Sequence, residues 1–253
     1  MRFPYLSVSA LFTSAVQMSS DPLNHVILVT GGSGLVGQGI RLALENPEYN
    51  LRRENEHWVF ASSKDVNLTD AKATQQYFEQ IRPTHVIHLA AKVGGLFANM
   101  SGNLEFFVKR NQPLVVWGSG APLRQFIYSV DLGRLIVWAL REYSDISPII
   151  LSVPEDQEIS IRQAAELVAL AMGCTQLTVS FLAHNCDCFL IVLLFSLLSG
   201  FHFDTSKADG QFRKTANAAK LRSLYPNFIF TPFEKAIQHT CDWFSENYAS
   251  ARK

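Results

Sequence analysis

Neither sign of charge predominates in this sequence. Its 253 residues include 22 Lys and Arg and 22 Asp and Glu, so the formal net charge is zero. A protein that binds nucleic acid or an anionic membrane surface through general electrostatics carries an excess of basic residues. The charge balance therefore argues against both kinds of partner, and it leaves open a small anionic substrate.

Cysteine is also scarce. The four cysteines have no regular spacing, which argues against a disulfide framework and fits a reducing compartment. Two of them form a Cys-x-Cys pair near two histidines, but that spacing is not typical of a zinc site, so we predict no metal centre. The cysteines are Cys174, Cys186, Cys188 and Cys241, and the histidines are His184 and His202.

Long apolar runs are missing as well. The longest, Cys188–Leu198, falls short of the roughly 20 residues that span a bilayer. Phe3–Val16 resembles a signal peptide only weakly, because proline, serine and threonine interrupt its apolar core. We therefore interpret residues 1–24 as an N-terminal extension, with Met18 as a natural start, and we predict a cytoplasmic protein with no membrane partner.

One stretch near the N-terminus dominates what is present. The apolar run Val26–Val29 predicts a buried parallel strand, and an amphipathic helix pattern begins at Leu35. Between them, glycines recur with the spacing G-x-x-G-x-x-G. Gly31 permits a sharp turn, Gly34 leaves backbone N–H groups open to a pyrophosphate, and Gly37 allows close helix packing. An ordinary strand–turn–helix corner is the alternative, but the whole pattern favours a dinucleotide-binding loop: Gly31, Gly32, Ser33, Gly34, Leu35, Val36 and Gly37.

The second predicted strand, Trp58–Ser62, bears on cofactor choice. In NAD-binding units an acidic residue at the end of this strand accepts the ribose hydroxyls. Here Ser63 and Lys64 supply a hydroxyl and a cation, which suit a 2′-phosphate. The pattern favours NADP(H) over NAD(H), although Asp65 follows directly. The alternative reading of Lys64 is a solvated loop lysine.

The next segments complete three strands and two crossovers. A helix is expected from Ala71, with Thr69 or Asp70 as its N-cap, ending before Pro83. The apolar run His85–Ala91 predicts a third strand, in which we interpret His88 as a hydrogen-bonded core residue. Together these elements predict an α/β fold, the first half of a Rossmann-type doubly wound parallel sheet.

The C-terminal half alternates strands and helices, which predicts a small second α/β domain. The expected strands are Arg124–Tyr128 and Ile149–Val153. The expected helices are Val130–Glu142 and Ile161–Met172, the latter capped by Ser160.

Several longer motifs carry a family resemblance. They are Thr30–Gly37, Ser62–Asp65, His85–Phe97, Val116–Gly120, Arg124–Leu132 and Phe203–Phe212. With these motifs the chain resembles the extended short-chain dehydrogenase/reductases and, within them, the GDP-L-fucose synthase family. Members of that family use NADPH to epimerise and reduce GDP-4-keto-6-deoxy-D-mannose.

The resemblance implies a set of binding residues and partners. For the cofactor it adds Asn67, Leu68, Ala90 and Ala91 to the glycine loop, Ser63 and Lys64. For the GDP-sugar it implies Trp117, Arg124 and Asp209, whose side chains suit a base or sugar ring, a diphosphate and hydroxyl groups. A homodimer is also implied.

The catalytic constellation of that family is missing from the sequence. The family needs a Tyr-x-x-x-Lys pair, in which the lysine depresses the tyrosine pKa, with a nearby Ser or Thr and a Cys and His for epimerisation. No tyrosine here has a lysine four positions later, and Leu114 already matches a segment that lies far downstream in the family. We therefore predict an internal deletion and assign no catalytic residue.

The predicted deletion determines the predicted domain boundaries. Residues 25–111 form a truncated NADP-binding domain, and residues 112–253 form the remnant of a substrate domain with an apolar insertion at 181–202. The deletion also truncates the dimer interface helices and is expected to leave the first strand with an exposed apolar edge. The function predicted by resemblance is GDP-L-fucose synthase-like with impaired catalysis. The alternative is a non-catalytic splice variant or gene-model product that binds NADP or the full-length subunit.

Overall fold

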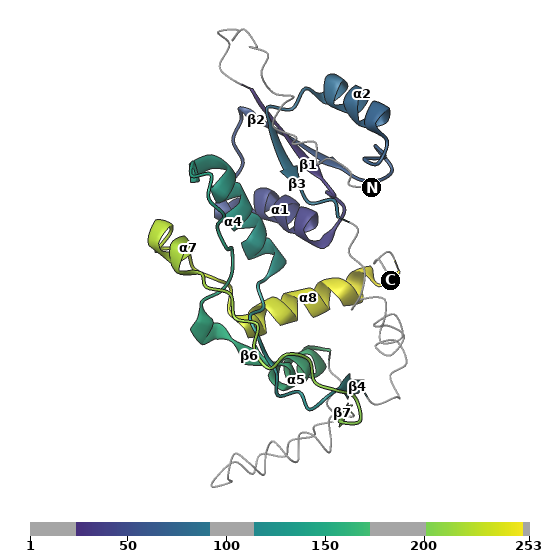
Figure 1. Cartoon of the computed structure of the whole chain (residues 1–253), viewed down its shortest axis with the longest axis vertical. Helices are drawn as coiled ribbons and strands as arrows, with labels where there is room; N and C mark the ends of the chain where they lie inside the picture. Colours follow the sequence, from purple (N-terminus) through teal and green to yellow (C-terminus); the bar gives the residue numbers. More distant parts are fainter. Residues whose placement is uncertain (1–23, 92–113, 173–200, 250–253) are drawn as a thin grey trace, which may run out of the picture.

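The computed structural model describes residues 24–91, 114–172 and 201–249 (Figure 1). The predicted N-terminal extension and most of the apolar insertion lie outside the described residues. So do the residues just after the third strand, where the predicted deletion falls.

The N-terminal half is a three-stranded parallel sheet. Its strands are β1 (His25–Thr30), β2 (Glu56–Ala61) and β3 (His85–His88), in the order β2-β1-β3. Thr30 at the end of β1 aligns with Ala61 on one side and with His88 on the other. The side chains of β1 from Ile27 to Thr30 are almost completely buried, as expected for the central strand of a parallel sheet.

The predicted exposed edge at the first strand is wrong. β1 is paired on both sides, and within the described residues the unpaired edges belong to β2 and β3. The physical reason is that the first crossover runs from β1 to β2, and the second returns from β2 past β1, so that β3 pairs with the other side of β1. The exposed apolar side chain is consequently Val86 of β3, which is 45% exposed.

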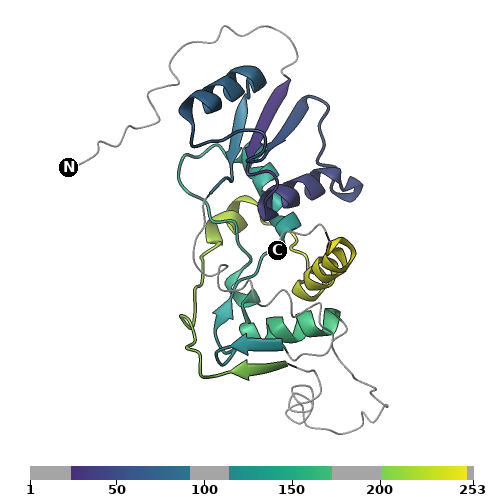
Figure 2. The same ribbon diagram turned by 90° about the vertical axis from the view of Figure 1, so that its right-hand side faces the viewer.

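Two helices connect the strands and lie on opposite sides of the sheet (Figure 2). Helix α1 (Leu35–Glu45) follows the glycine loop, and the short 3-10 helix η2 (Pro47–Tyr49) leads on toward β2. Helix α2 (Ala71–Ile81) begins at Asp70, whose carboxylate accepts hydrogen bonds from the backbone N–H groups of Lys72 and Ala73. The prediction of Asp70 as one of two candidate N-caps is thus confirmed.

A helix from the C-terminal half completes the main core. Helix α4 (Ser129–Glu142) packs on α1, and Val137 joins Ile27, Val29, Ile40 and Leu44 in one buried cluster. The two helices approach closely where glycines face each other. A Cβ atom added at Gly133 would lie 2.5 Å from the carbonyl carbon of Gly39, a separation that no side chain tolerates.

The remaining elements occupy the middle and lower parts of Figure 1. Two small sheets pair β4 (Leu114–Trp117) with β7 (Phe201–Asp204) in parallel and β5 (Leu123–Arg124) with β6 (Ile159–Ser160) antiparallel. The helices and the one 3-10 helix are η4 (Glu155–Gln157), α5 (Ile161–Ala171), α7 (Ala219–Leu224) and α8 (Phe233–Asn247). Ser160 and Gln163 form a reciprocal capping box at the start of α5, which confirms the predicted Ser160 cap.

Two strand predictions in this half need correction. Ile149–Val153 is irregular, and of Arg124–Tyr128 only Arg124 belongs to a strand. Both segments are apolar enough for a strand, but a strand also needs a partner for its backbone groups. The Val153 carbonyl instead accepts a hydrogen bond from the Gln125 side chain at 2.8 Å.

Among the helices of the described residues, none combines the length and the apolar character needed to cross a membrane.

Candidate functional site

The glycine loop turns directly out of β1. Gly31 has a φ of +72°, a left-handed conformation that favours glycine. A Cβ atom there would lie 2.8 Å from the backbone nitrogen of Ala90, just after β3. The Gly32 N–H donates a hydrogen bond of 2.8 Å to the carbonyl of Ala61 at the end of β2. The loop is therefore held against the carboxyl ends of both neighbouring strands.

The other two motif glycines differ in what surrounds them. A Cβ atom at Gly37 would lie 2.5 Å from the carbonyl oxygen of Gly32, so Gly37 packs on the loop itself. A Cβ atom at Gly34 would meet only the Gly31 carbonyl, at 3.2 Å. Gly34 is the N-cap of α1 without a side-chain cap. The start of this helix thus keeps unblocked backbone donors, as phosphate binding at a helix N-terminus requires. Beside Gly34, Ser33 and Leu35 are exposed and Val36 is half-buried.

The segment after β2 forms a tight polar turn. One oxygen of the Asp65 carboxylate accepts hydrogen bonds from the Ser62 backbone N–H and the Ser62 hydroxyl, both at 2.7 Å. These bonds from Ser62 hold the pKa of Asp65 below its ordinary value. Ser63 and Lys64 at the tip of the turn are exposed. Farther along, the exposed Asn67 accepts hydrogen bonds from Thr69, and Leu68 is half-buried.

The end of β3 closes the third side of this site. Ala90 packs against Gly31, while Ala91 is exposed. The imidazole Nδ1 of His88 lies 2.7 Å from the hydroxyl of the buried Thr30. His88 is therefore hydrogen-bonded as predicted, but it is exposed, so the expectation that it lies in the core is wrong. Its side chain projects from the same edge strand as the exposed Val86, where the described residues provide no covering strand.

A second group of predicted residues gathers in the lower half of the chain. Trp117 is 54% exposed at the end of β4, and the Lys207 ammonium lies 5.7 Å from its ring centroid. The Asp209 carboxylate accepts hydrogen bonds from the Ser119 N–H at 2.8 Å and the Ser119 hydroxyl at 2.5 Å. These Ser119 bonds lower the pKa of Asp209. Asp209 is thus tied to the turn that follows Trp117.

Arg124 lies close to the same loop. Its guanidinium donates to the backbone carbonyl of Leu123 at 2.6 Å and to that of Phe212 at 3.4 Å. A Cβ atom at Gly210 would lie 3.5 Å from Arg124 Nη2. The structure therefore brings Trp117, Arg124 and Asp209 to one loop region, although they are far apart in sequence.

Sequence reasoning missed two residues of this region. Ser119 organises the turn through both of its bonds to Asp209, and Lys207 adds a cation beside Trp117. The run Gly118-Ser119-Gly120 is a turn signal, and both glycines have positive φ. Nothing in the sequence alone pairs that turn with residues about ninety positions later.

One tyrosine–lysine contact does occur, but it lies in the wrong place for reduction. Lys220 Nζ is 2.6 Å from the Tyr143 hydroxyl and 2.8 Å from an Asp145 carboxylate oxygen. Tyr143 caps the C-terminal end of α4, where Arg141 bonds to Glu56 at the start of β2. This cluster is therefore near the amino end of the sheet, whereas the glycine loop is at the carboxyl end.

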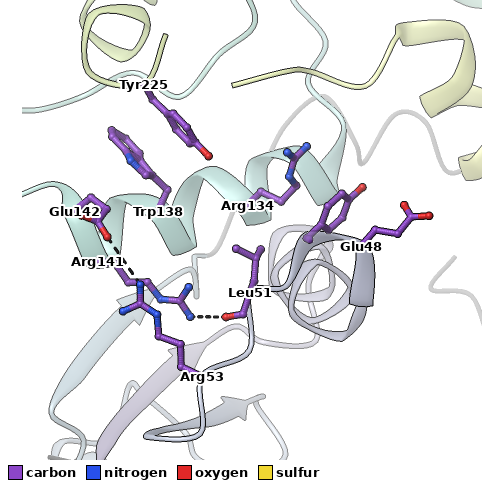
Figure 3. A pocket seen from close by; sticks show the side chains of 9 residues that line it. Glu48, Leu51, Arg53, Arg134, Trp138, Arg141, Glu142 and Tyr225 are labelled. Atoms are coloured by element: carbon purple, nitrogen blue, oxygen red, sulfur yellow. Dashed lines mark hydrogen bonds and ion pairs between the residues drawn. The ribbon is translucent and has the colours of Figure 1, made fainter. Parts of the chain in front are cut away.

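A cavity of about 310 Å³ lies in the same area (Figure 3). Trp138 and Tyr225 stack on one side, and three arginines reach toward it. Each arginine has an acidic partner in the structure, so the cavity offers no surplus positive charge for an anion. The pairs are Arg53 with Glu142, Arg134 with Asp131, and Arg141 with Glu56.

Comparison with known proteins identifies the class to which this chain belongs. The family model described as "NAD dependent epimerase/dehydratase family" matches residues 27–110 and 107–153. The chain belongs to this family, and its parallel sheet, glycine loop and crossovers are those of a Rossmann-type fold.

Within that family, the chain is similar to GDP-L-fucose synthases. It is 31% identical to the GDP-L-fucose synthase of Dictyostelium discoideum over 347 aligned positions, covering 93% of this chain and all of that protein. It is 30% identical to a probable GDP-L-fucose synthase of Drosophila melanogaster, covering 90% and 99%. A crystal structure of a GDP-L-fucose synthetase from Naegleria fowleri bound to NADP matches with a TM-score of 0.70 and 27% identity, covering 94% and 98%.

The alignments also bear on what this chain lacks. The alignment with the Dictyostelium protein is longer than the chain itself, 347 positions against 253 residues. It must therefore include gaps opposite residues that only the relative contains. The family model matches in two pieces that overlap at residues 107–110, a few residues before the deletion that the sequence predicts between residues 111 and 114.

Proposed function

We propose that this chain binds NADP(H) at the glycine loop and a GDP-sugar near Trp117, without the epimerisation and reduction of its relatives. The absence of a side chain at Gly34, at the start of α1, carries the cofactor part of the proposal. A side chain at that position would meet only one carbonyl oxygen, so the backbone is free to approach a pyrophosphate. The NADP bound to the Naegleria relative supports this choice of cofactor.

The turn after β2 supports NADP(H) over NAD(H). Ser63 and Lys64 are exposed at its tip, and the Asp65 carboxylate is engaged by Ser62. A hydroxyl and an ammonium group bind a 2′-phosphate, whereas a ribose hydroxyl pair is recognised by a free carboxylate.

The GDP-sugar proposal rests on the loop region around Asp209. An exposed indole can stack on a base or sugar ring, and the cation of Lys207 lies beside it. Arg124 and Asp209 contribute a guanidinium and a carboxylate from the neighbouring segments. The GDP-L-fucose synthases similar to this chain support a sugar nucleotide as the ligand class.

Loss of catalysis is proposed from the sequence and the alignments. The sequence has no Tyr-x-x-x-Lys pair, and the family model matches in two separate pieces that overlap at residues 107–110. A general acid or base typically contributes 10²–10⁴-fold to a rate, and several such groups are missing together.

The proposal also covers the domain organisation, the cellular location and the assembly of the chain. We propose that residues 25–111 and 112–253 descend from separate cofactor and substrate domains. The irregular spacing of the four cysteines supports a cytoplasmic location, and the balanced charge argues against nucleic acid as a partner. Pairing with itself or with a full-length subunit is the proposed mode of assembly.

Calorimetric titration of the purified chain with NADPH and NADH tests the cofactor proposal. NADPH should bind at least about tenfold more tightly, a difference of roughly 1.4 kcal/mol. A Lys64→Gln variant should lose most of this preference and leave NADH binding unchanged. Equal affinities of the wild-type chain for the two dinucleotides would reject the assignment of Ser63 and Lys64 to the 2′-phosphate.

A further inference from the structure

The turn after β2 is stabilised by hydrogen bonds between two of its own residues, Ser62 and Asp65. Both hydrogen bonds from Ser62 go to the same oxygen of the Asp65 carboxylate. The Ser62 hydroxyl in turn accepts a hydrogen bond from the Lys64 N–H at 3.2 Å, and the Ser62 carbonyl accepts one from the Asp65 N–H at 3.1 Å. The backbone on both sides of Ser63 is thereby held in one conformation.

This turn is connected to the phosphate-binding loop. Ala61, the residue before Ser62, accepts the hydrogen bond from Gly32 in the glycine loop. On the other side, Val66 is 8% exposed and anchors the end of the turn in the protein. The tip carrying Ser63 and Lys64 is consequently placed relative to the start of α1.

We infer that Asp65 is the positioning residue for selection of the 2′-phosphate, because it holds Ser63 and Lys64 at the tip of this turn. The inference rests on the proposed binding of NADP(H). It assigns to Asp65 a role opposite to that of an acidic residue that selects NAD. Such a residue points its free oxygens at the ribose hydroxyls, whereas here one carboxylate oxygen is bonded twice within the turn.

Two substitutions separate the geometry of Asp65 from its charge. In Asp65→Asn, the amide oxygen still accepts both hydrogen bonds from Ser62, and a negative charge near the phosphate is removed. In Asp65→Ala, the charge is removed to the same extent, but the oxygen that accepts both hydrogen bonds is lost. A purely electrostatic role predicts that the two variants behave alike, and a positioning role predicts that they differ.

The test measures dissociation constants for NADPH and NADH with the full chain and both variants. Asp65→Asn should keep the wild-type preference for NADPH or increase it up to about threefold, since like-charge repulsion is relieved. Asp65→Ala should reduce the preference at least about tenfold, with the NADH constant unchanged. Hydrogen exchange should show the Ser62 amide protected in the wild type and in Asp65→Asn, and fast in Asp65→Ala.

Each other outcome overturns the inference in a recognisable way. If Asp65→Ala keeps the preference for NADPH, or loses both dinucleotides equally, Asp65 does not position the phosphate ligands. If the wild-type chain prefers NADPH but both variants change alike, only the positioning role fails. If the wild-type chain binds neither dinucleotide, the proposed cofactor function fails, and this inference fails with it.

Discussion

Gly34 occupies a position where a side chain would need only a small shift of one backbone carbonyl but would block the proposed ligand. A Cβ atom there would be limited only by the Gly31 carbonyl at 3.2 Å. Gly31 and Gly37 differ, because side chains there would collide with backbone atoms at 2.8 Å and 2.5 Å. The three motif glycines therefore serve different purposes, and only Gly34 allows binding to be tested without disturbing the loop.

Replacement of Gly34 by leucine should abolish dinucleotide binding with little effect on folding. The new side chain would occupy the space over the start of α1 that the pyrophosphate needs. We expect NADPH affinity to fall at least about 100-fold, measured by calorimetry. The thermal unfolding midpoint should stay within a few degrees of the wild-type value, about the change caused by 1 kcal/mol or less. Undiminished NADPH binding would remove the loop from the site.

Glu56 gives a prediction for the pH dependence of stability. Burial tends to raise the pKa of its carboxyl group, but the hydrogen bonds from Arg141 and Trp58 outweigh burial and hold the pKa below 4.5. A lowered folded-state pKa stabilises the protein above the unfolded-state value, and this contribution is lost as the pH falls through the folded-state pKa. The wild-type free energy of unfolding should therefore decrease as the pH falls below about 5.

A Glu56→Gln variant checks this assignment by urea unfolding at pH 7 and at several values from pH 5 downward. At pH 7 the variant should be less stable by about 3 kcal/mol, because the buried Arg141 loses its charged partner. Its stability should also change less with falling pH than that of the wild type. Parallel pH profiles for the two proteins would show that Glu56 is not responsible for the acid dependence.

At the scale of elements, the contact between α1 and α4 depends on two glycines. Gly133→Ala should improve the intrinsic helix propensity of α4 by about 1 kcal/mol. The added Cβ atom would nevertheless meet the Gly39 backbone at 2.5 Å. We expect a net destabilisation of about 1–3 kcal/mol from the forced separation of the helices.

Gly210→Ala provides the control for this substitution, because its Cβ atom would make only an ordinary contact with Arg124 at 3.5 Å. Its unfolding midpoint should match that of the wild type. If Gly133→Ala were as stable as the wild type, the close crossing of α1 and α4 would be wrong.

Helix α4 also joins the two halves of the chain at the scale of the whole molecule. Its residues come after the predicted deletion, yet Val137 packs on β1 and Arg141 bonds to Glu56 of β2. The cofactor half is thus covered by a helix from the other half, while β4, which ends at Trp117, lies in the lower part of Figure 1. The proposed sugar-nucleotide site and the proposed dinucleotide site therefore lie on different parts of the molecule, and their ligand binding can be measured separately.

The whole chain should show no measurable epimerase-reductase turnover with GDP-4-keto-6-deoxy-D-mannose and NADPH. Reduction needs a proton donor at the carbonyl oxygen, and water cannot replace several positioned groups at once. NADPH oxidation followed by absorbance is the measurement, with a full-length GDP-L-fucose synthase as the positive control. Turnover close to that of the control, in a sample free of host enzyme, would contradict the deletion.

The features that the sequence by itself determined are those set by interactions between residues close together along the chain. The glycine spacing after Val29 predicted the loop, and Asp70 and Ser160 predicted helix starts, because a cap bonds to residues two or three positions away. The confirmed fold class follows from the same local signals, since strands and helices that alternate produce parallel sheets.

Only the tertiary structure decided which distant segments meet. It placed β3 beside β1, left Ile149–Val153 without a strand partner, and bonded Asp209 to Ser119. Trp117, Arg124 and Asp209 of the proposed sugar-nucleotide site were expected from the family resemblance, but their meeting point and the contributions of Ser119 and Lys207 were not. The physical reason is that an apolar run or a carboxylate can find a partner on any segment that the fold brings near, and no local pattern specifies which one.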